Sequence, residues 1–163
     1  METVWRRHAF HAEGVRKAVA AWDGCELVAR GPDWASDTVS AIYTPEGVDA
    51  REVISGAYNR YQTSLGTGLN KLMGKAFRIG HLGSLNPVML CGAISAAEMA
   101  LRDAGARIEP GSGVAAAQER KQDATGFWRP ALDRLEARPP PDHPDIGRAR
   151  NDLNQFLSSK PNT

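Results

Sequence analysis

The sequence lacks any apolar run long enough to cross a bilayer. Its first ten residues, METVWRRHAF, contain no apolar core of the kind that a signal peptide needs. It also lacks an excess of either charge, since 20 lysines and arginines face 19 aspartates and glutamates, for a net charge of +1. This balance argues against nucleic-acid binding, which depends on a clustered basic surface. We therefore expect a soluble cytoplasmic protein with no membrane and no nucleic-acid partner.

Cysteine is nearly absent. Cys25 and Cys91, the only two, lie far apart among apolar neighbours, so we expect buried, reduced thiols rather than a disulfide or a thiolate metal site. Histidine is also scarce, and no HExxH pattern or Cys/His pairing accompanies it, which predicts that there is no metal site. The four histidines are His8, His11, His81 and His143.

Periodic apolar residues are present over most of the first 119 positions. The 163 residues, 42% of them hydrophobic, suffice for one globular domain with a core. Helical and strand periodicities alternate. The predicted helices are 2–22, the segment opened by Asp49 and the segment from Asn86 to Gly105, and the predicted strands are 25–29, 38–44, one short strand within 63–74, and 75–81. This order predicts an α/β (α+β sandwich) fold, with a small, mostly antiparallel sheet and helices on one face.

Two helix starts and one helix end have sequence signatures. Asp49 followed by Glu52 three positions later matches the capping-box pattern. Asn86 and Pro87 fit an N-cap followed by the first helical position, and Gly105 fits a C-terminal stop. These positions fix the expected bounds of the second and third helices.

The chain changes character after residue 119. Residues 120–163 hold six of the ten prolines and little periodic apolar pattern. Trp128, Leu132 and Leu135 could form one short helix at helical spacing. We therefore predict a domain over 1–119 and a proline-rich, poorly ordered tail over 120–163.

Three segments carry a family resemblance: SDTVSAI, LGTGLNKLMGKAFRIGHLG and AEMALRDAG. Together with their surroundings, over residues 5–118, they resemble the C-terminal small domain of class V aminotransferases, which are fold-type I enzymes that depend on pyridoxal phosphate. Within that class the similarity is greatest to serine–glyoxylate aminotransferases, relatives of alanine–glyoxylate aminotransferase. RIGHLG alone would be a weak signal, whereas the three segments together are specific.

An arginine stands between two apolar residues in the strand AFRIG. The resemblance implies that this arginine, Arg78, binds the α-carboxylate of an amino-acid or oxo-acid substrate. A guanidinium fork can bind a carboxylate through two hydrogen bonds and keeps its charge when partly buried. A strand is a rigid mount, and Gly80 and Gly83 would allow close approach of the backbone. From the residues alone, an ion pair between Arg78 and a carboxylate such as Asp37 is an equal alternative, and the resemblance favours substrate binding.

Other residues invite functional interpretations that their patterns do not support. LGTGLNK and GSG lack the spacing of a phosphate-binding loop, so we expect ordinary turn glycines there. Lys71 and Lys75 are expected to be solvated lysines beside a strand, not a Schiff-base lysine. His81 follows the arginine strand and could line the same pocket, but a loop histidine with satisfied hydrogen bonds is at least as good an interpretation. We assign it no catalytic role.

The resemblance also implies parts that this sequence does not contain. In the family a large domain supplies the Schiff-base lysine, the aspartate on the pyridine nitrogen and most phosphate ligands. We therefore expect a partial aminotransferase, a fragment that does not bind pyridoxal phosphate alone and binds substrate only in a site completed by a large domain or a homologous subunit. Ser84 and Pro87 stand where the family pattern has an acidic pair, which fits relaxed selection.

Two alternatives to a partial enzyme remain at this stage. An isolated small domain would expose the apolar face that packs on its partner domain, so the chain could be a non-enzymatic interaction module that docks on a homologue or self-associates. The chain could also be a nonfunctional remnant of a truncated aminotransferase gene.

Overall fold

The structure, a computed structural model, describes residues 2–119, and the predicted tail over 120–163 lies outside the described residues. Four α-helices and four strands alternate largely as predicted. The elements are α1 (Glu2–Ala21), β1 (Glu26–Leu27), the 3-10 turn η1 (Pro32–Trp34), β2 (Val39–Tyr43), α2 (Ala50–Tyr61), β3 (Gly66–Thr67), the 3-10 turn η2 (Asn70–Leu72), β4 (Ala76–Gly80), α3 (Pro87–Asp103) and α4 (Ser112–Gln118). The short helix α4 is the one α-helix or strand of the described part that periodicity did not predict, and the two 3-10 turns were not predicted either.

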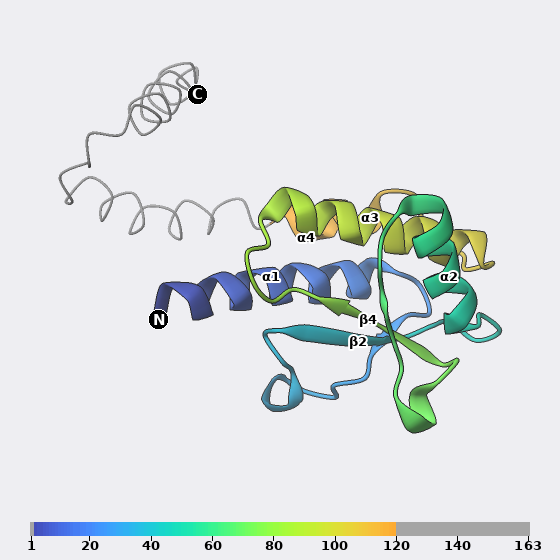
Figure 1. Ribbon diagram of the computed structural model, residues 1–163, viewed down its shortest axis with the longest axis horizontal. Coiled ribbons are helices and arrows are strands. Elements are labelled where there is room, and N and C mark those ends of the chain that lie inside the picture. The colour runs from blue at the N-terminus through green and yellow to red at the C-terminus, as the bar shows by residue number, and fades with distance from the viewer. Residues whose placement is uncertain (1, 120–163) are drawn as a thin grey trace, which may run out of the picture. The chain divides into compact units, whose positions relative to one another are not determined.

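The four strands form one sheet in the order β1-β2-β4-β3, with every neighbouring pair antiparallel. The central strands β2 and β4 pair along their whole length, from Val39 opposite Gly80 to Tyr43 opposite Ala76. Figure 1 shows α1, α3 and α4 together on one side of β2 and β4. The predicted α/β fold with a small antiparallel sheet covered by helices on one face is confirmed.

Strand alternation separates the two faces of this sheet. Ile42, Phe77 and Ile79 are at most 2% exposed and belong to the hydrophobic core between the sheet and the helices. Arg78, between two of them, lies on the opposite face because successive side chains of a strand point to opposite sides. We call this second face, which carries Arg78 and Ala41, the open face.

The long helix α1 contributes one apolar stripe to the core. Val15, Val19 and Trp22 recur at intervals of three and four residues, and all three are almost fully buried. The same stripe was predicted from the spacing of apolar residues over 2–22. We expect burial of these side chains to be the main stabilisation of α1, since helices in proteins owe most of their stability to packing of an amphipathic face.

The predicted helix caps are present, with one correction. Asn86 accepts the Met89 amide at 2.9 Å, Pro87 is the first residue of α3, and Gly105 follows the helix with φ of +99°. Asp49 caps α2, but its carboxylate accepts the Arg51 amide at 2.8 Å and is held by the Arg51 guanidinium. The capping-box pairing with Glu52 was therefore wrong, because the Glu52 amide donates to the main-chain carbonyl oxygen of Asp49, at 3.0 Å, instead of to its side chain.

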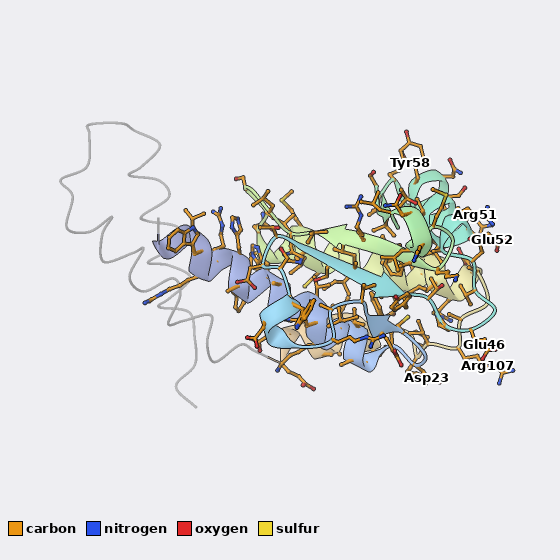
Figure 2. All side chains as sticks on the ribbon, turned by 90° about the horizontal axis from the view of Figure 1, so that it is seen from below. Asp23, Glu46, Arg51, Glu52, Tyr58 and Arg107 are labelled. Atoms are coloured by element: carbon orange, nitrogen blue, oxygen red, sulfur yellow. The ribbon has the colours of Figure 1, made fainter. Side chains whose placement is uncertain are left out.

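A salt bridge joins α2 to α3 at the surface. Arg60 Nη1 lies 2.8 Å from Asp103 Oδ2, and the Tyr61 hydroxyl donates to the same oxygen at 2.7 Å. The hydrogen bond from Tyr61, followed by that from Arg60, holds the pKa of Asp103 below its ordinary value. On α2 itself, Figure 2 shows Arg51, Glu52 and Tyr58 pointing away from the sheet.

None of the helices within residues 2–119 has both the length and the apolar character that a bilayer crossing needs.

Candidate functional site

Arg78 is mounted in the middle of β4, between the neighbouring strands β2 and β3. Ala41 is its partner on β2 and Gly66 is its partner on β3. The side chain is half-buried on the open face. Both neighbours on that face are small, so the guanidinium is not covered by a side chain from the adjacent strands.

The Arg78 side chain makes one recorded hydrogen bond within the described residues. Its Nε donates to the backbone carbonyl oxygen of Thr67 at 2.9 Å. The two terminal nitrogens, Nη1 and Nη2, have no recorded partner among residues 2–119. The guanidinium is therefore tethered at one nitrogen and keeps two donors for a ligand.

The alternative partner considered for Arg78 is occupied elsewhere. Asp37 Oδ1 lies 3.4 Å from Arg16 Nη2, an ion pair between the loop before β2 and α1. No carboxylate of residues 2–119 forms an ion pair with Arg78. The proposed Arg78–Asp37 pair is therefore wrong, because Asp37 belongs to the helix-covered side of the molecule.

His81 is a buried histidine with both ring nitrogens satisfied. Its Nδ1 lies 3.1 Å from the Asp37 carbonyl oxygen, which can only accept, so Nδ1 carries the proton. Its Nε2 then accepts from the Ser40 hydroxyl at 3.0 Å. Burial, as the largest cause, lowers the pKa of His81 and keeps the ring neutral. This environment favours the structural interpretation of His81 over a place in the site of Arg78.

The loop after β4 is fastened to the first half of α1. The Gly83 amide donates to His8 Nε2 at 3.2 Å, and Arg7 Nη2 donates to the Gly83 carbonyl oxygen at 2.7 Å. Gly83 has φ of +93°, a left-handed conformation that favours glycine. The role of Gly83 is thus to turn the chain and meet α1. The glycine that packs against Arg78 is Gly66, which lies in strand β3, so the expectation of an ordinary turn glycine was wrong for it.

Within residues 2–119, the other chemically reactive side chains form no hydrogen bond or ion pair with Arg78. Lys71 and Lys75 are exposed, as predicted. Cys25 is buried and unpaired, and burial raises the pKa of its thiol to about 12. Cys91 is unpaired but half-buried, so the expectation of two fully buried thiols was wrong for it. Within residues 2–119, no three His, Cys, Asp or Glu side chains come together as a metal site.

A hollow of the described part lies beside β2. It has a volume of about 680 Å³, and its lining includes Ala41, Val39, Ser36, Trp34 and Arg30. Arg78 does not line it. The guanidinium therefore stands on an open surface, and a second wall would be needed to enclose a ligand there.

Comparisons with known proteins decide the family. The chain is 56% identical over 117 residues to a serine–glyoxylate aminotransferase of Methylorubrum extorquens, a match that covers 72% of this chain and 29% of that protein. It is 50% identical over 125 residues to an L-aspartate–glyoxylate aminotransferase of Paracoccus denitrificans, covering 77% of this chain and 31% of the relative. The chain belongs to the class V aminotransferases. Its described part is their C-terminal domain.

A solved aminotransferase structure shares this fold. The pyridoxamine–pyruvate aminotransferase of Mesorhizobium loti is 35% identical, with a TM-score of 0.67, over 72% of this chain and 30% of that one. No family model matches the chain. The chain spans about 29% of the length of the serine–glyoxylate aminotransferase of Methylorubrum extorquens. The aminotransferase resemblance and the fold that it implied are thus confirmed.

Proposed function

We propose that Arg78 is the group that binds the substrate carboxylate in a transaminase site that a large domain completes. The supporting observation is a guanidinium fixed at Nε on a rigid strand, with Nη1 and Nη2 unpaired among the described residues. Two parallel N–H donors match the two oxygens of a carboxylate. Amino acids and glyoxylate-type oxo acids, the substrates in the names of the relatives, share that group.

Pyridoxal phosphate does not fit the described residues by themselves. Lys71 and Lys75 project from the surface, and no lysine lines the larger hollows of residues 2–119. A covalent bond to the cofactor needs a lysine beside a pocket that holds the ring and phosphate. We therefore assign the cofactor to the large domain or a homologous subunit, and residues 1–119 to the substrate-binding small domain.

Reconstitution from two chains tests this function. The full chain would be mixed with the separately produced large-domain portion of the Methylorubrum extorquens enzyme and pyridoxal phosphate, and transamination between serine and glyoxylate measured. We expect activity that Arg78→Ala lowers by about a hundredfold in kcat/KM, because two charge-assisted hydrogen bonds are lost. Arg78→Lys should restore only part of it, since an ammonium does not present a planar fork.

Arg30→Ala is the matched control, because Arg30 is an exposed arginine that forms no ion pair within residues 2–119. It should leave kcat/KM unchanged. Equal activity of the unsubstituted chain and Arg78→Ala would contradict the proposal.

A second candidate function is supported by exposed apolar side chains. Trp5, Leu82, Val88 and Met89 are 54–79% exposed and come from the beginnings of α1 and α3 and the loop after β4. Figure 1 shows both helices beginning at the same end of the described part. Such side chains are typical of a protein–protein contact, so a non-enzymatic interaction module remains the alternative.

A further inference from the structure

Gly66 faces the Arg78 side chain across the β3–β4 pair. A Cβ atom placed on Gly66 would lie 3.1 Å from Arg78 Cβ, 3.2 Å from Nε and 3.5 Å from Cζ. The first two distances are tighter than ordinary contacts between carbon and its neighbours. The stem and the guanidinium of Arg78 therefore lie directly over the position where any other residue would carry its side chain.

The backbone at this position does not itself require glycine. Gly66 is not among the residues with positive φ, and it forms regular strand pairing with Arg78. Gly68, two residues later, differs, because a Cβ there would overlap the carbonyl groups of Leu72 and Ala76. Gly68 therefore belongs to the turn, whereas the space at Gly66 is filled by Arg78.

The next residue completes the arrangement. The Thr67 carbonyl oxygen accepts from Arg78 Nε at 2.9 Å, so the guanidinium is drawn towards β3 and across Gly66. An arginine can bind a carboxylate side-on, through Nε and one Nη, or end-on, through Nη1 and Nη2. Because the single hydrogen of Nε is already donated to the Thr67 carbonyl oxygen, Nη1 and Nη2 are left to bind a carboxylate end-on.

We propose that Gly66 and the Thr67 carbonyl are positioning elements for Arg78, and that they make it bind carboxylates end-on through Nη1 and Nη2. This inference rests on the proposed function of Arg78 as a carboxylate-binding group. Gly66 provides the space in which the side chain lies, and Thr67 fixes its direction. A small shift of a binding group weakens recognition strongly, so a larger residue at 66 impairs binding without touching the ligand.

The first test follows the Arg78 Nε–H group by NMR in the full, nitrogen-15-labelled chain. We expect its exchange with water to be slowed about tenfold or more relative to exposed Arg30, since a hydrogen-bonded N–H exchanges only on opening. Gly66→Ala should reduce this protection, and Gly66→Val should abolish it. Gly92→Val is the matched control, because Gly92 is an exposed residue of α3, on the helix-covered side of the sheet, and a Cβ there meets nothing within 4 Å.

We expect the Gly66 variants to stay folded, so that a loss of Nε–H protection can be assigned to Arg78 itself. Alanine and valine are compatible with the strand conformation of Gly66, and valine has a higher strand propensity than glycine. Thermal unfolding of each variant provides the check. Unchanged Nε–H protection in a folded Gly66→Val variant would overturn the inference.

The second test mixes the same labelled chains with the large-domain portion used in the reconstitution, titrates the mixture with acetate and follows the Arg78 resonances. We expect the dissociation constant to rise about tenfold in Gly66→Val, which corresponds to about 1.4 kcal/mol of binding free energy, and to stay constant in Gly92→Val. A response lost in Arg78→Ala but unchanged in Gly66→Val would overturn the inference and leave the proposed function standing. No response in the unsubstituted chain, or one that survives in Arg78→Ala, would overturn the proposed function and with it this inference.

Discussion

Three buried histidines lie where the first half of α1 meets the end of β4. His8 accepts a backbone hydrogen bond from Gly83, and His81 accepts from Ser40 while donating to Asp37. His11, between them on α1, is 1% exposed, and its Nδ1 has no partner within the described residues. Protonation of His11 would place a charge near Arg7, His8 and His81.

The pKa of His11 predicts a loss of stability in mild acid. Burial first, and then the charges of Arg7, His8 and His81, lower its pKa from 6.5 to about 4. The unfolded chain thus binds more protons than the folded chain between these values, so the stability present above pH 6.5 is lost as the pH falls towards 4. We expect a decrease on the order of 2–3 kcal/mol in the free energy of unfolding from His11.

Urea unfolding across that pH range measures the effect. His11→Gln, which does not titrate, should flatten the dependence in part, and the remainder should come from His81, whose pKa is also lowered. A free energy of unfolding that is constant over this range in the unsubstituted chain would refute the prediction.

For single residues, the sequence was enough to single out Arg78 but not the residues that contact its side chain. Arg78 stood out because a cation interrupts an apolar strand, and its face follows from alternation alone. Gly66 and Thr67 could not be assigned, because β3 is only two residues long and its register on β4 is set by the turn η2. The Arg78–Asp37 pair failed for a similar reason, since Arg16 reaches Asp37 from a distant part of the sequence.

Among the elements, α4 depends on a buried carboxylate. Glu98, on α3, is 4% exposed and accepts the Gly113 amide at 2.8 Å, the Gly111 amide, and Trp22 Nε1 at 2.9 Å. Amides at the beginning of a helix have no partners within it, so Glu98 satisfies them and ties α4 to both α1 and α3. A Cβ on Gly113 would overlap the Trp22 ring, which requires glycine there.

Replacement of Glu98 should destabilise the domain through this junction. Glu98→Gln keeps the shape but presents an amide where acceptors are needed, so we expect a loss of about 2–4 kcal/mol in the free energy of unfolding. Amide exchange in α4 should accelerate more than exchange in α2. Glu52→Gln, an exposed residue on α2, should change stability by less than about 0.5 kcal/mol. Equal stability of the two variants would count against the junction.

The long elements were predictable, and α4 was not. The stripe of α1 and the caps of α2 and α3 are local signals that survive in the fold. Seven residues of small side chains, SGVAAAQ, carry no helical apolar stripe, and their helix forms through contacts with Glu98 and Trp22 that are far away in sequence.

For the whole molecule, the exposed apolar side chains at the beginnings of α1 and α3 and in the loop after β4 predict self-association of the full chain. Leu82 and Val88 are 63% and 79% exposed, and burying such side chains against a second copy is favourable. Sedimentation at increasing protein concentration should show a rising mass, and Leu82→Asp with Val88→Asp should lower it. Tyr58→Asp is the control, because Tyr58 is 64% exposed but lies on α2, as Figure 2 shows. A constant monomer mass at every concentration would contradict the prediction.

Strand β4 carries core residues on one face and Arg78 on the other. The register of this strand therefore affects both the stability of the fold and the proposed binding of a ligand. A slip of one position against β2 would send Phe77 into water and drive a permanent cation into the apolar interior, at a cost of several kcal/mol. A mispaired molecule would therefore be unstable as well as unable to bind, so copies that fold but present the guanidinium on the wrong side should not accumulate.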